Sequence, residues 1–278
     1  MRTAATTDRN IRRATAAALL AIGGTGTLRA QLAASPYSAA DSTYTQNFDN
    51  LLSPVPANAT EVSATVLPPG VSFVEAGANA DASLRVDNGS SSTGDTFLYG
   101  ATGSNERALG AYASGSLTSQ YGITLRNNTG ATLNQFTLSY TGEQWKDGGS
   151  GMAVINTETF SYAVGALTLN ATTGYTQVAD LDFRALVNNT TADRTLNGNS
   201  SEYSRQIGAT VSGINWTAGS TLTLRWTDQN DPGNDDGLAI DDLAFSATVP
   251  EPATAAAGFL MLGALGWSLR RQTRSRAT

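Results

Sequence analysis

The sequence predicts an all-β fold: an antiparallel, two-sheet, jelly-roll-like sandwich, flanked by an N-terminal signal peptide and a single C-terminal transmembrane helix. Apolar and polar residues alternate repeatedly with the period of two that marks half-buried strands. Turn-forming pairs such as Asn88-Gly89 separate these runs. Between residues 31 and 248 no stretch of helical length carries apolar residues at helical spacing, which favours two packed layers of strands.

Eleven short strands are expected in this central domain. The clearest run sets Leu222, Leu224 and Trp226 against intervening polar residues, so Trp226 is expected in the core. The strands are expected at 44–48, 71–75, 84–86, 96–99, 108–112, 121–125, 136–141, 160–164, 205–211, 221–227 and 238–247. The Asn- and Thr-rich segment 168–204 is expected to be a long surface loop. About 215 residues can bury a full core without disulfides, which the chain lacks.

The first thirty residues are typical of a signal peptide. Arg2, Arg9 and the pair Arg12-Arg13 precede an apolar stretch at 14–22, and glycines then interrupt any helix. This pattern predicts export by the secretory route and removal of residues 1–30.

The last thirty residues predict a membrane span. Residues 253–269 carry no charge, and at about 1.5 Å per residue they span about 25 Å, the short end of a hydrocarbon core. Trp267 is expected near one interface, and Arg270 and Arg271 mark the cytoplasmic side. The domain 31–248 is therefore expected outside the membrane.

The C-terminal segment 249–278 resembles the PEP-CTERM sorting signal of Gram-negative bacteria. The resemblance rests on Pro250-Glu251-Pro252, the short hydrophobic helix after it, and the Arg-rich tail 270–278. It implies that exosortase, a membrane transpeptidase, processes the protein, which is anchored in the membrane until then. It also implies a place in the cell envelope or extracellular matrix of bacteria that make exopolysaccharide and biofilms.

Composition excludes several kinds of chemistry. The chain has no histidine and no cysteine, which removes Ser–His–Asp triads, thiolate catalysis and Cys- or His-based metal sites. Residues 31–248 hold 21 acidic and eight basic residues, a formal net charge of −13. Because such a domain repels phosphate and attracts divalent cations, we expect no nucleic-acid partner.

The densest group of oxygen ligands lies at 228–242, where fifteen residues include six aspartates. Carboxylates on a loop rich in Asn, Pro and Gly suit Ca²⁺, which takes six to eight oxygen ligands. We expect a calcium site from Asp241, Asp242, Asp49 and Asp228. Two alternatives are open: Asp241 is neutralised by a salt bridge or by amides, or the aspartates are simply solvated.

The run Gly237–Leu243 resembles the closing strand of MAM-like and concanavalin-like jelly rolls. The resemblance implies that this strand lies beside the first one, near Phe48-Asp49, and that Asp241 helps to hold a structural calcium ion. A second local expectation is that Glu143 pairs with Arg107 or Arg225 within a sheet.

No catalysis is expected. Paired carboxylates for a glycosidase could come only from Glu106, Glu143, Asp228 and Asp241, and the Glu-x-Asp-x-x-Glu strand motif of concanavalin-like glycosidases is absent. The sequence favours an exported structural or adhesive protein. The alternative is a module that binds exopolysaccharide, with Trp145 and Trp216, both near turns, as stacking surfaces. If both indoles are buried, they instead pack at the rim of the sandwich.

Overall fold

The computed structural model describes residues 33–52, 54–149, 155–188 and 191–249. The predicted signal peptide, Pro250-Glu251-Pro252, Trp267, Arg270 and Arg271 lie outside the described residues. The helices in the described ranges are the short 3-10 turns η1 (Ala64–Val66) and η2 (Ala179–Leu181). Neither has the length or the apolar sequence needed to cross a bilayer.

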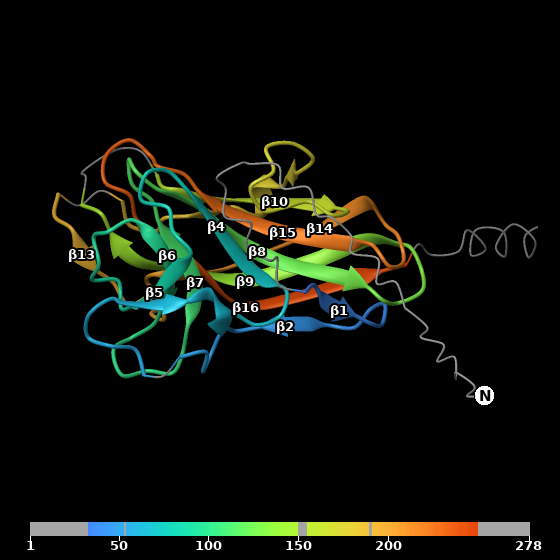
Figure 1. Ribbon diagram of the computed structural model, residues 1–278, viewed down its shortest axis with the longest axis horizontal. Helices are drawn as coiled ribbons and strands as arrows, with labels where there is room; N and C mark the ends of the chain where they lie inside the picture. The colour runs from blue at the N-terminus through green and yellow to red at the C-terminus, as the bar shows by residue number, and fades with distance from the viewer. Residues whose placement is uncertain (1–32, 53, 150–154, 189–190, 250–278) are drawn as a thin grey trace, which may run out of the picture. The chain divides into compact units, whose positions relative to one another are not determined.

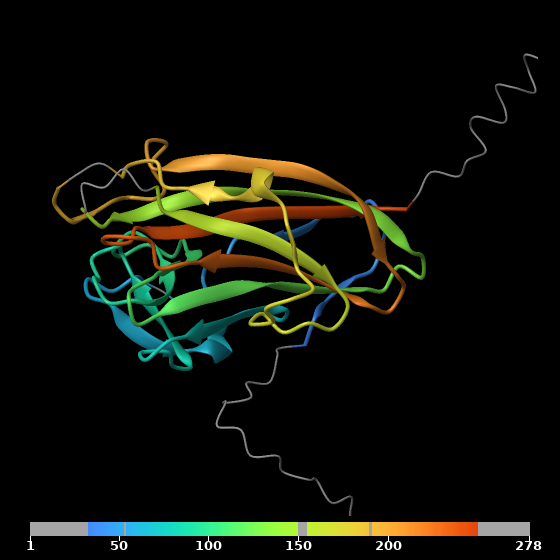
Figure 2. The same ribbon diagram turned by 90° about the horizontal axis from the view of Figure 1, so that it is seen from above.

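The described residues form two facing β-sheets (Figures 1 and 2). The first sheet runs in the order β1 (Ser35–Tyr37), β8 (Thr118–Asn127), β15 (Thr221–Asp228), β10 (Thr157–Val164) and β11 (Thr176–Gln177). Two further strands extend it, β4 (Val71–Ala76) on β8 and β12 (Phe183–Arg184) on β10.

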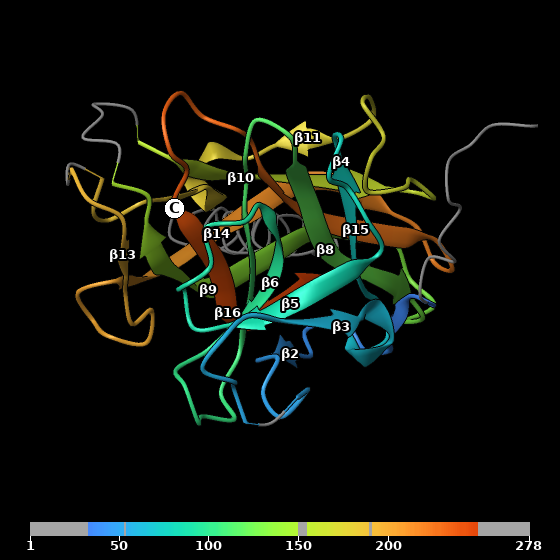
Figure 3. The same ribbon diagram turned by 60° about the vertical axis from the view of Figure 1, so that its left-hand side comes forward.

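The second sheet is larger, and its order can be followed in Figure 3. It runs β13 (Arg194–Thr195), β9 (Leu133–Asp147), β16 (Gly237–Thr248), β7 (Ala108–Tyr112), β6 (Asp95–Tyr99), β5 (Ser83–Asp87) and β3 (Thr60–Ser63). β14 (Ser204–Trp216) also pairs with β9, and β2 (Tyr44–Gln46) pairs with β16.

All eleven strands expected from alternation are present, and the sandwich is confirmed. From β8 to β10 and from β14 to β16, successive long strands alternate between the two sheets, in keeping with jelly-roll-like winding. The expectation of purely antiparallel sheets is wrong, because β1 runs parallel to β8 and β5 runs parallel to β6. β5 is only five residues long, so the seven residues 88–94 are enough to carry the chain back along it.

The core between the sheets is built around Trp226, which is fully buried as expected. Its indole stacks on Tyr121 at 6.2 Å between ring centroids and receives the edges of Tyr140 and Phe160 at 5.4 and 5.0 Å. Each of these residues lies at an inward position of an alternating strand, so the period of two in the sequence directly produces this aromatic cluster.

The segment 168–204 is not only a surface loop. It contributes η2, three two-residue strands and the buried side chains of Leu181, Phe183 and Leu196. The Tyr140 hydroxyl donates to the Leu181 carbonyl at 2.7 Å, and the Gln144 side-chain oxygen accepts from the amides of residues 186 and 187. Pieces this short show no detectable period, which is why alternation did not reveal them.

Candidate cation site on the second sheet

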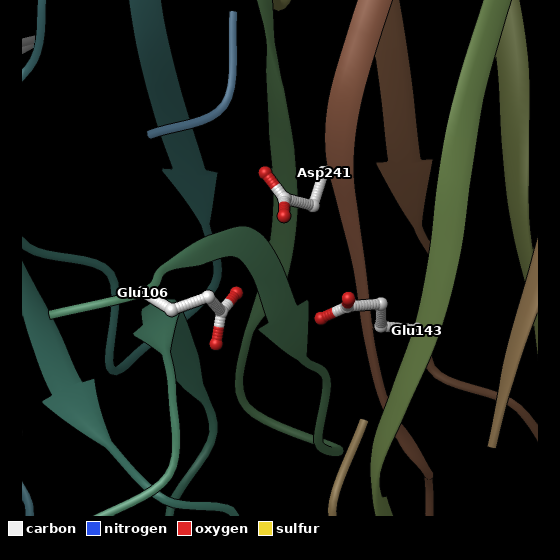
Figure 4. Close-up of side chains that lie close together, drawn as sticks. All are labelled: Glu106, Glu143 and Asp241. Atoms are coloured by element: carbon white, nitrogen blue, oxygen red, sulfur yellow. The ribbon is translucent and has the colours of Figure 1, made fainter. Parts of the chain in front are cut away.

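Three carboxylates converge on the second sheet, from Glu106, Glu143 and Asp241 (Figure 4). One carboxylate oxygen from each lies within 4.8 Å of the others. Glu143 is on β9, Asp241 is on β16, and Glu106 stands two residues before β7. Because Tyr140 on β9 faces the main core, Glu143 three residues later projects from the opposite face of the sheet.

Strand register brings two of these side chains together. Glu143 pairs with Ala239 and Asp241 pairs with Thr141, so Glu143 and Asp241 are diagonal neighbours on one face. The register shifts just after Asp241, and Asp242 there has a positive φ of 48°. At this bulge Asp241 is buried while Asp242 is exposed, as expected for adjacent residues that point apart.

Hydrogen bonds satisfy only part of the cluster. Glu143 accepts from the Trp145 indole N–H at 2.9 Å, and Glu106 accepts from the Asn199 side-chain amide. The second oxygen of Glu106 and Oδ1 of Asp241 are buried and have no partner among the described residues. Since an unpartnered buried carboxylate is costly, the cluster requires either protons or a cation.

The electrostatics of the cluster agree with this requirement. Burial, reinforced by the Glu143 and Asp242 charges, raises the pKa of Asp241 to about 9. Burial, with the Glu106 charge, raises the pKa of Glu143 to about 8. The pKa of Glu106 is also raised, chiefly by burial. Without a cation the site therefore holds protons at neutral pH, and a divalent cation would replace them.

The expected ion pair of Glu143 with an arginine is wrong. The Arg107 guanidinium donates to the backbone carbonyls of Leu52, Ser104 and Glu106. Arg225 donates to Ser161 and to two loop carbonyls. The backbone carbonyls thus take up both guanidinium groups, and the salt-bridge alternative does not account for the carboxylate cluster.

The predicted calcium ligands divide into two groups. Asp241 is in the cluster, and the charges of Asp49 and Asp242 contribute to the raised pKa of Glu106 and of Glu143. β2 pairs with β16, which confirms that the closing strand lies beside the N-terminal one. Sequence reasoning did not group Glu106 and Glu143 with Asp241, because Glu143 reaches it only through the β9–β16 register and Glu106 comes from the segment before β7.

Asp228 belongs to a different place, so its inclusion with Asp241 is wrong. It pairs with Glu158 across β15 and β10, and both side chains are buried. Both Glu158 oxygens and Oδ2 of Asp228 lack a partner among the described residues. Burial raises the pKa of Glu158 to about 8 and that of Asp228 well above its ordinary range. Burial therefore favours the protonated form of both carboxyl groups.

The aspartates of the loop between β15 and β16 are held by amide groups. The Asp235 carboxylate accepts from the Asp231 amide at 2.7 Å, and Asp236 accepts from the Gly148 amide at 2.8 Å. The Asn156 side chain donates to Asp231 at 3.1 Å. Amide groups, and not a cation, are therefore the partners of these three carboxylates among the described residues.

The two tryptophans proposed as stacking surfaces are buried, with 1% of Trp145 and none of Trp216 exposed. Trp145 stacks on Tyr99 at 5.9 Å. Trp216 packs on Tyr37 at 5.6 Å and Phe245 at 6.0 Å. The prediction that these indoles present faces to a saccharide is wrong: Trp216 belongs to the main hydrophobic core, and Trp145 belongs to a second buried cluster that includes Tyr99.

Fold and site together define a β-sandwich domain with a carboxylate cluster suited to a divalent cation. No family model and no curated protein matches the chain. Among solved structures, the enzymatically active domain of bacteriophage CBA120 tailspike protein 4 is 9% identical with a TM-score of 0.36, over 64% of this chain and 19% of that one. This chain thus spans about a fifth of that protein.

Two further solved structures are matched over nearly their whole length. The K1 cleaved adhesin domain of Lys-gingipain from Porphyromonas gingivalis W83 is 13% identical, with a TM-score of 0.30 over 74% of this chain and 99% of that one. The family 11 carbohydrate-binding module from Clostridium thermocellum, in complex with a mixed-linked tetrasaccharide, is 8% identical, with a TM-score of 0.29 over 74% and 98%. Similarity at this level does not extend to function.

Proposed function

We propose that this chain is an exported protein of the cell envelope or extracellular matrix, whose sandwich is a non-catalytic, cation-stabilised module in contact with exopolysaccharide. The observation that carries the proposal is the convergence of Glu106, Glu143 and Asp241, with buried oxygens left unpartnered. Hard oxygen ligands of this kind are those that Ca²⁺ prefers.

In this proposal the ion is structural. Glu143 and Asp241 would hold it between β9 and β16, and Glu106 would join the segment before β7 to the same ion. Asp49 and Asp242 would add negative charge around it. The Arg107 charge already acts on Glu106 and Asp49. Glu143 and Asp241 form no ion pair among the described residues, so the ion would neutralise these two carboxylates and hold together three segments that are distant in sequence.

The geometry supports a module without catalysis. Glycosidases place their two carboxyl groups about 5–10 Å apart on either side of a sugar. One oxygen from each of Glu106, Glu143 and Asp241 lies within 4.8 Å of the other two, a spacing that suits one shared ion better. Asp228 and Glu158 are buried between the sheets, away from any substrate.

The contact with polysaccharide is supported by the exposed face of β9 and β14. Cross-strand side-chain hydrogen bonds join Thr137 to Thr210 at 2.9 Å and Ser212 to Gln135 at 2.8 Å. Gln206 donates to Thr141 in the same row. These hydroxyl and amide groups give an uncharged surface that can exchange hydrogen bonds with hydrated sugars.

Export and processing are tested in the native host. In a strain with exosortase, mass spectrometry of the protein should find a C-terminus within the segment 249–278, and in an exosortase deletion residues 253–278 should stay attached. An identical C-terminus in both strains would contradict processing.

The proposed calcium ion is tested by measuring the thermal midpoint of the purified full chain, first with calcium and then with chelator. An unchanged midpoint counts against the ion.

A further inference from the structure

The basic residues of the described domain fall into two groups. Arg85, Lys146 and Arg194 form ion pairs with aspartates at 2.6–3.3 Å. Arg107, Arg126 and Arg225 donate hydrogen bonds to backbone carbonyls. Six of the eight cations in residues 31–248 are thus engaged.

The two that remain are Arg184 and Arg205. Both are exposed, and within the described ranges neither guanidinium has a hydrogen bond or an ion pair. Arg184 acts at longer range on Asp182, partly offsetting the burial that raises the pKa of that residue. The Asp182 carboxylate already accepts from the Phe160 amide at 2.7 Å. Two exposed arginines without a direct hydrogen bond or ion pair in the described ranges are therefore free to bind an anion, although the domain has a net charge of −13.

Both arginines line the same groove, whose volume is about 440 Å³. Arg184 comes from β12, which pairs with β10 of the first sheet, and Arg205 comes from β14 of the second sheet. Ser201 and Ser204 line the groove with them, and so does Ile155, which is 45% exposed. Glu202 is the acidic residue of the lining.

We propose that this groove binds a carboxylate-bearing sugar unit of an acidic exopolysaccharide, a proposal that rests on the function proposed above and names its ligand class. A guanidinium holds a carboxylate through two parallel hydrogen bonds, which a lysine cannot reproduce. The Ser201 hydroxyl can exchange hydrogen bonds with the sugar hydroxyls, and the Ser204 hydroxyl, which donates to the Ser200 carbonyl at 3.0 Å, can accept from them. Ile155 offers an apolar surface to the C–H face of the ring.

The charge of the groove favours a ligand with few, widely spaced carboxylates over a polymer with closely spaced negative charges. Two arginines and Glu202 leave the groove with a formal charge of +1, which suits one carboxylate. Nucleic acid carries a phosphate on every nucleotide, and these phosphates would be repelled by the domain's net charge of −13. A saccharide that carries one carboxylate per ring and uncharged hydroxyls elsewhere matches both the groove and its polar surroundings.

The test is calorimetric titration of the purified full chain with trigalacturonate, in chelator so that calcium bound by the sugar has no part. Binding is expected to weaken at least tenfold in Arg184→Gln and Arg205→Gln, and Arg205→Lys should restore only a fraction of it. The matched control is Arg126→Gln, which removes an arginine whose guanidinium donates to the Gly219 carbonyl in the turn between β14 and β15. Equal thermal midpoints for the variants would show that the fold is unchanged.

Three results of the titration would overturn the groove proposal. Equal binding of trigalacturonate and neutral maltotriose, or unchanged binding in both groove variants, would overturn the proposal. Tighter binding of hexaglutamate than of trigalacturonate would overturn it in favour of an acidic peptide. Failure of the groove proposal is distinguishable from failure of the proposed function. If the protein binds neutral polysaccharide from the host and Arg184→Gln does not change that binding, the proposed polysaccharide-contacting module stands and only the groove is excluded as its acidic-sugar site.

Discussion

The Asp241 carboxylate lies beside that of Glu143, projecting from the neighbouring strand, and the Glu143 charge raises the pKa of Asp241. The sheet register holds these two residues at diagonal positions on one face, so ionising both carboxyl groups brings like charges together in a buried site. The cost of ionising them is therefore built into the fold, and an ion that removes this cost stabilises the folded state selectively.

Calcium should raise the thermal midpoint of the full chain at pH 8. At a concentration 100-fold above the dissociation constant the gain is about 2.7 kcal/mol, or roughly 5–10 °C for a domain of this size. Glu143→Gln and Asp241→Asn should lose most of this gain, since each removes a charged ligand. Glutamine at 143 can still accept from the Trp145 indole.

The control for this experiment is Asp180→Asn, which removes an exposed carboxylate in η2. It should keep the full calcium response. Equal responses of the wild-type chain and the Glu143 variant would exclude the cluster as the site.

Calcium affinity should rise with pH between 6 and 9. In the cation-free protein Glu143 titrates with a pKa of about 8 and Asp241 with a pKa of about 9, so at pH 7 both are mostly protonated. The ion must displace these protons, and about two should be released per ion bound at pH 7. Titration calorimetry in buffers of different ionisation enthalpy counts them, and a count of zero would contradict the cluster.

The pair Glu158–Asp228 should make the cation-free protein less stable as pH rises. The pKa of Glu158 is about 8 in the folded protein against an ordinary value of 4.5, so the folded state holds an extra proton between these values. The stability is then fully present below pH 4.5 and is lost as the pH rises to about 8. Urea unfolding in chelator at pH 5 and pH 8 measures the difference.

Glu158→Gln tests the origin of this pH dependence. The amide has nearly the same volume and no charge, so the variant should lose less stability than the wild type between pH 5 and pH 8. The exposed carboxylate of Glu61 on β3 provides the comparison, and Glu61→Gln should keep the wild-type slope. Identical slopes for the Glu158 variant and the wild type would refute the assignment.

Gly110→Ala should destabilise the domain by about 3 kcal/mol or more, because overpacking at a rigid site is costly. A Cβ at Gly110 would collide with the backbone of β16 at Leu238 and Ala239, which has no room to move. Gly115→Ala is the matched substitution, since a Cβ there meets nothing within 4 Å. Urea unfolding should leave Gly115→Ala within about 0.5 kcal/mol of the wild type; similar losses in both would contradict the close approach.

Much of the fold is visible in the sequence because alternation is a local property. The run Leu222, Leu224 and Trp226 identifies β15 and its inward face without any knowledge of its neighbours. The same reasoning correctly separated Asp241 from Asp242. The resemblance of Gly237–Leu243 to jelly-roll closing strands correctly placed this strand beside the one expected at 44–48. What it could not give is strand direction, which depends on how far a connection such as 88–94 can reach.

The site is less predictable because it depends on contacts between distant segments. Nothing local ties Glu106 to Glu143, and only the pairing of β9 with β16 brings Glu143 to Asp241. Trp145 lies close to a turn, as a surface residue would, yet Gly198 from the segment 168–204 closes over its indole. The segment 168–204 has no periodic pattern of apolar residues, so the sequence does not reveal that it covers the Trp145 indole.

The Tyr37 side chain fastens the beginning of the domain to its end. Its hydroxyl donates to the Ser42 carbonyl at 2.7 Å and accepts from the Ala247 amide at 2.8 Å, a bond that joins residues 210 positions apart. β16 is also flanked by β9 along its length and by β7 and β2 on its other side. A pull on the chain after residue 248 therefore loads many backbone hydrogen bonds in shear at once, so a domain tethered by its C-terminus would resist mechanical force.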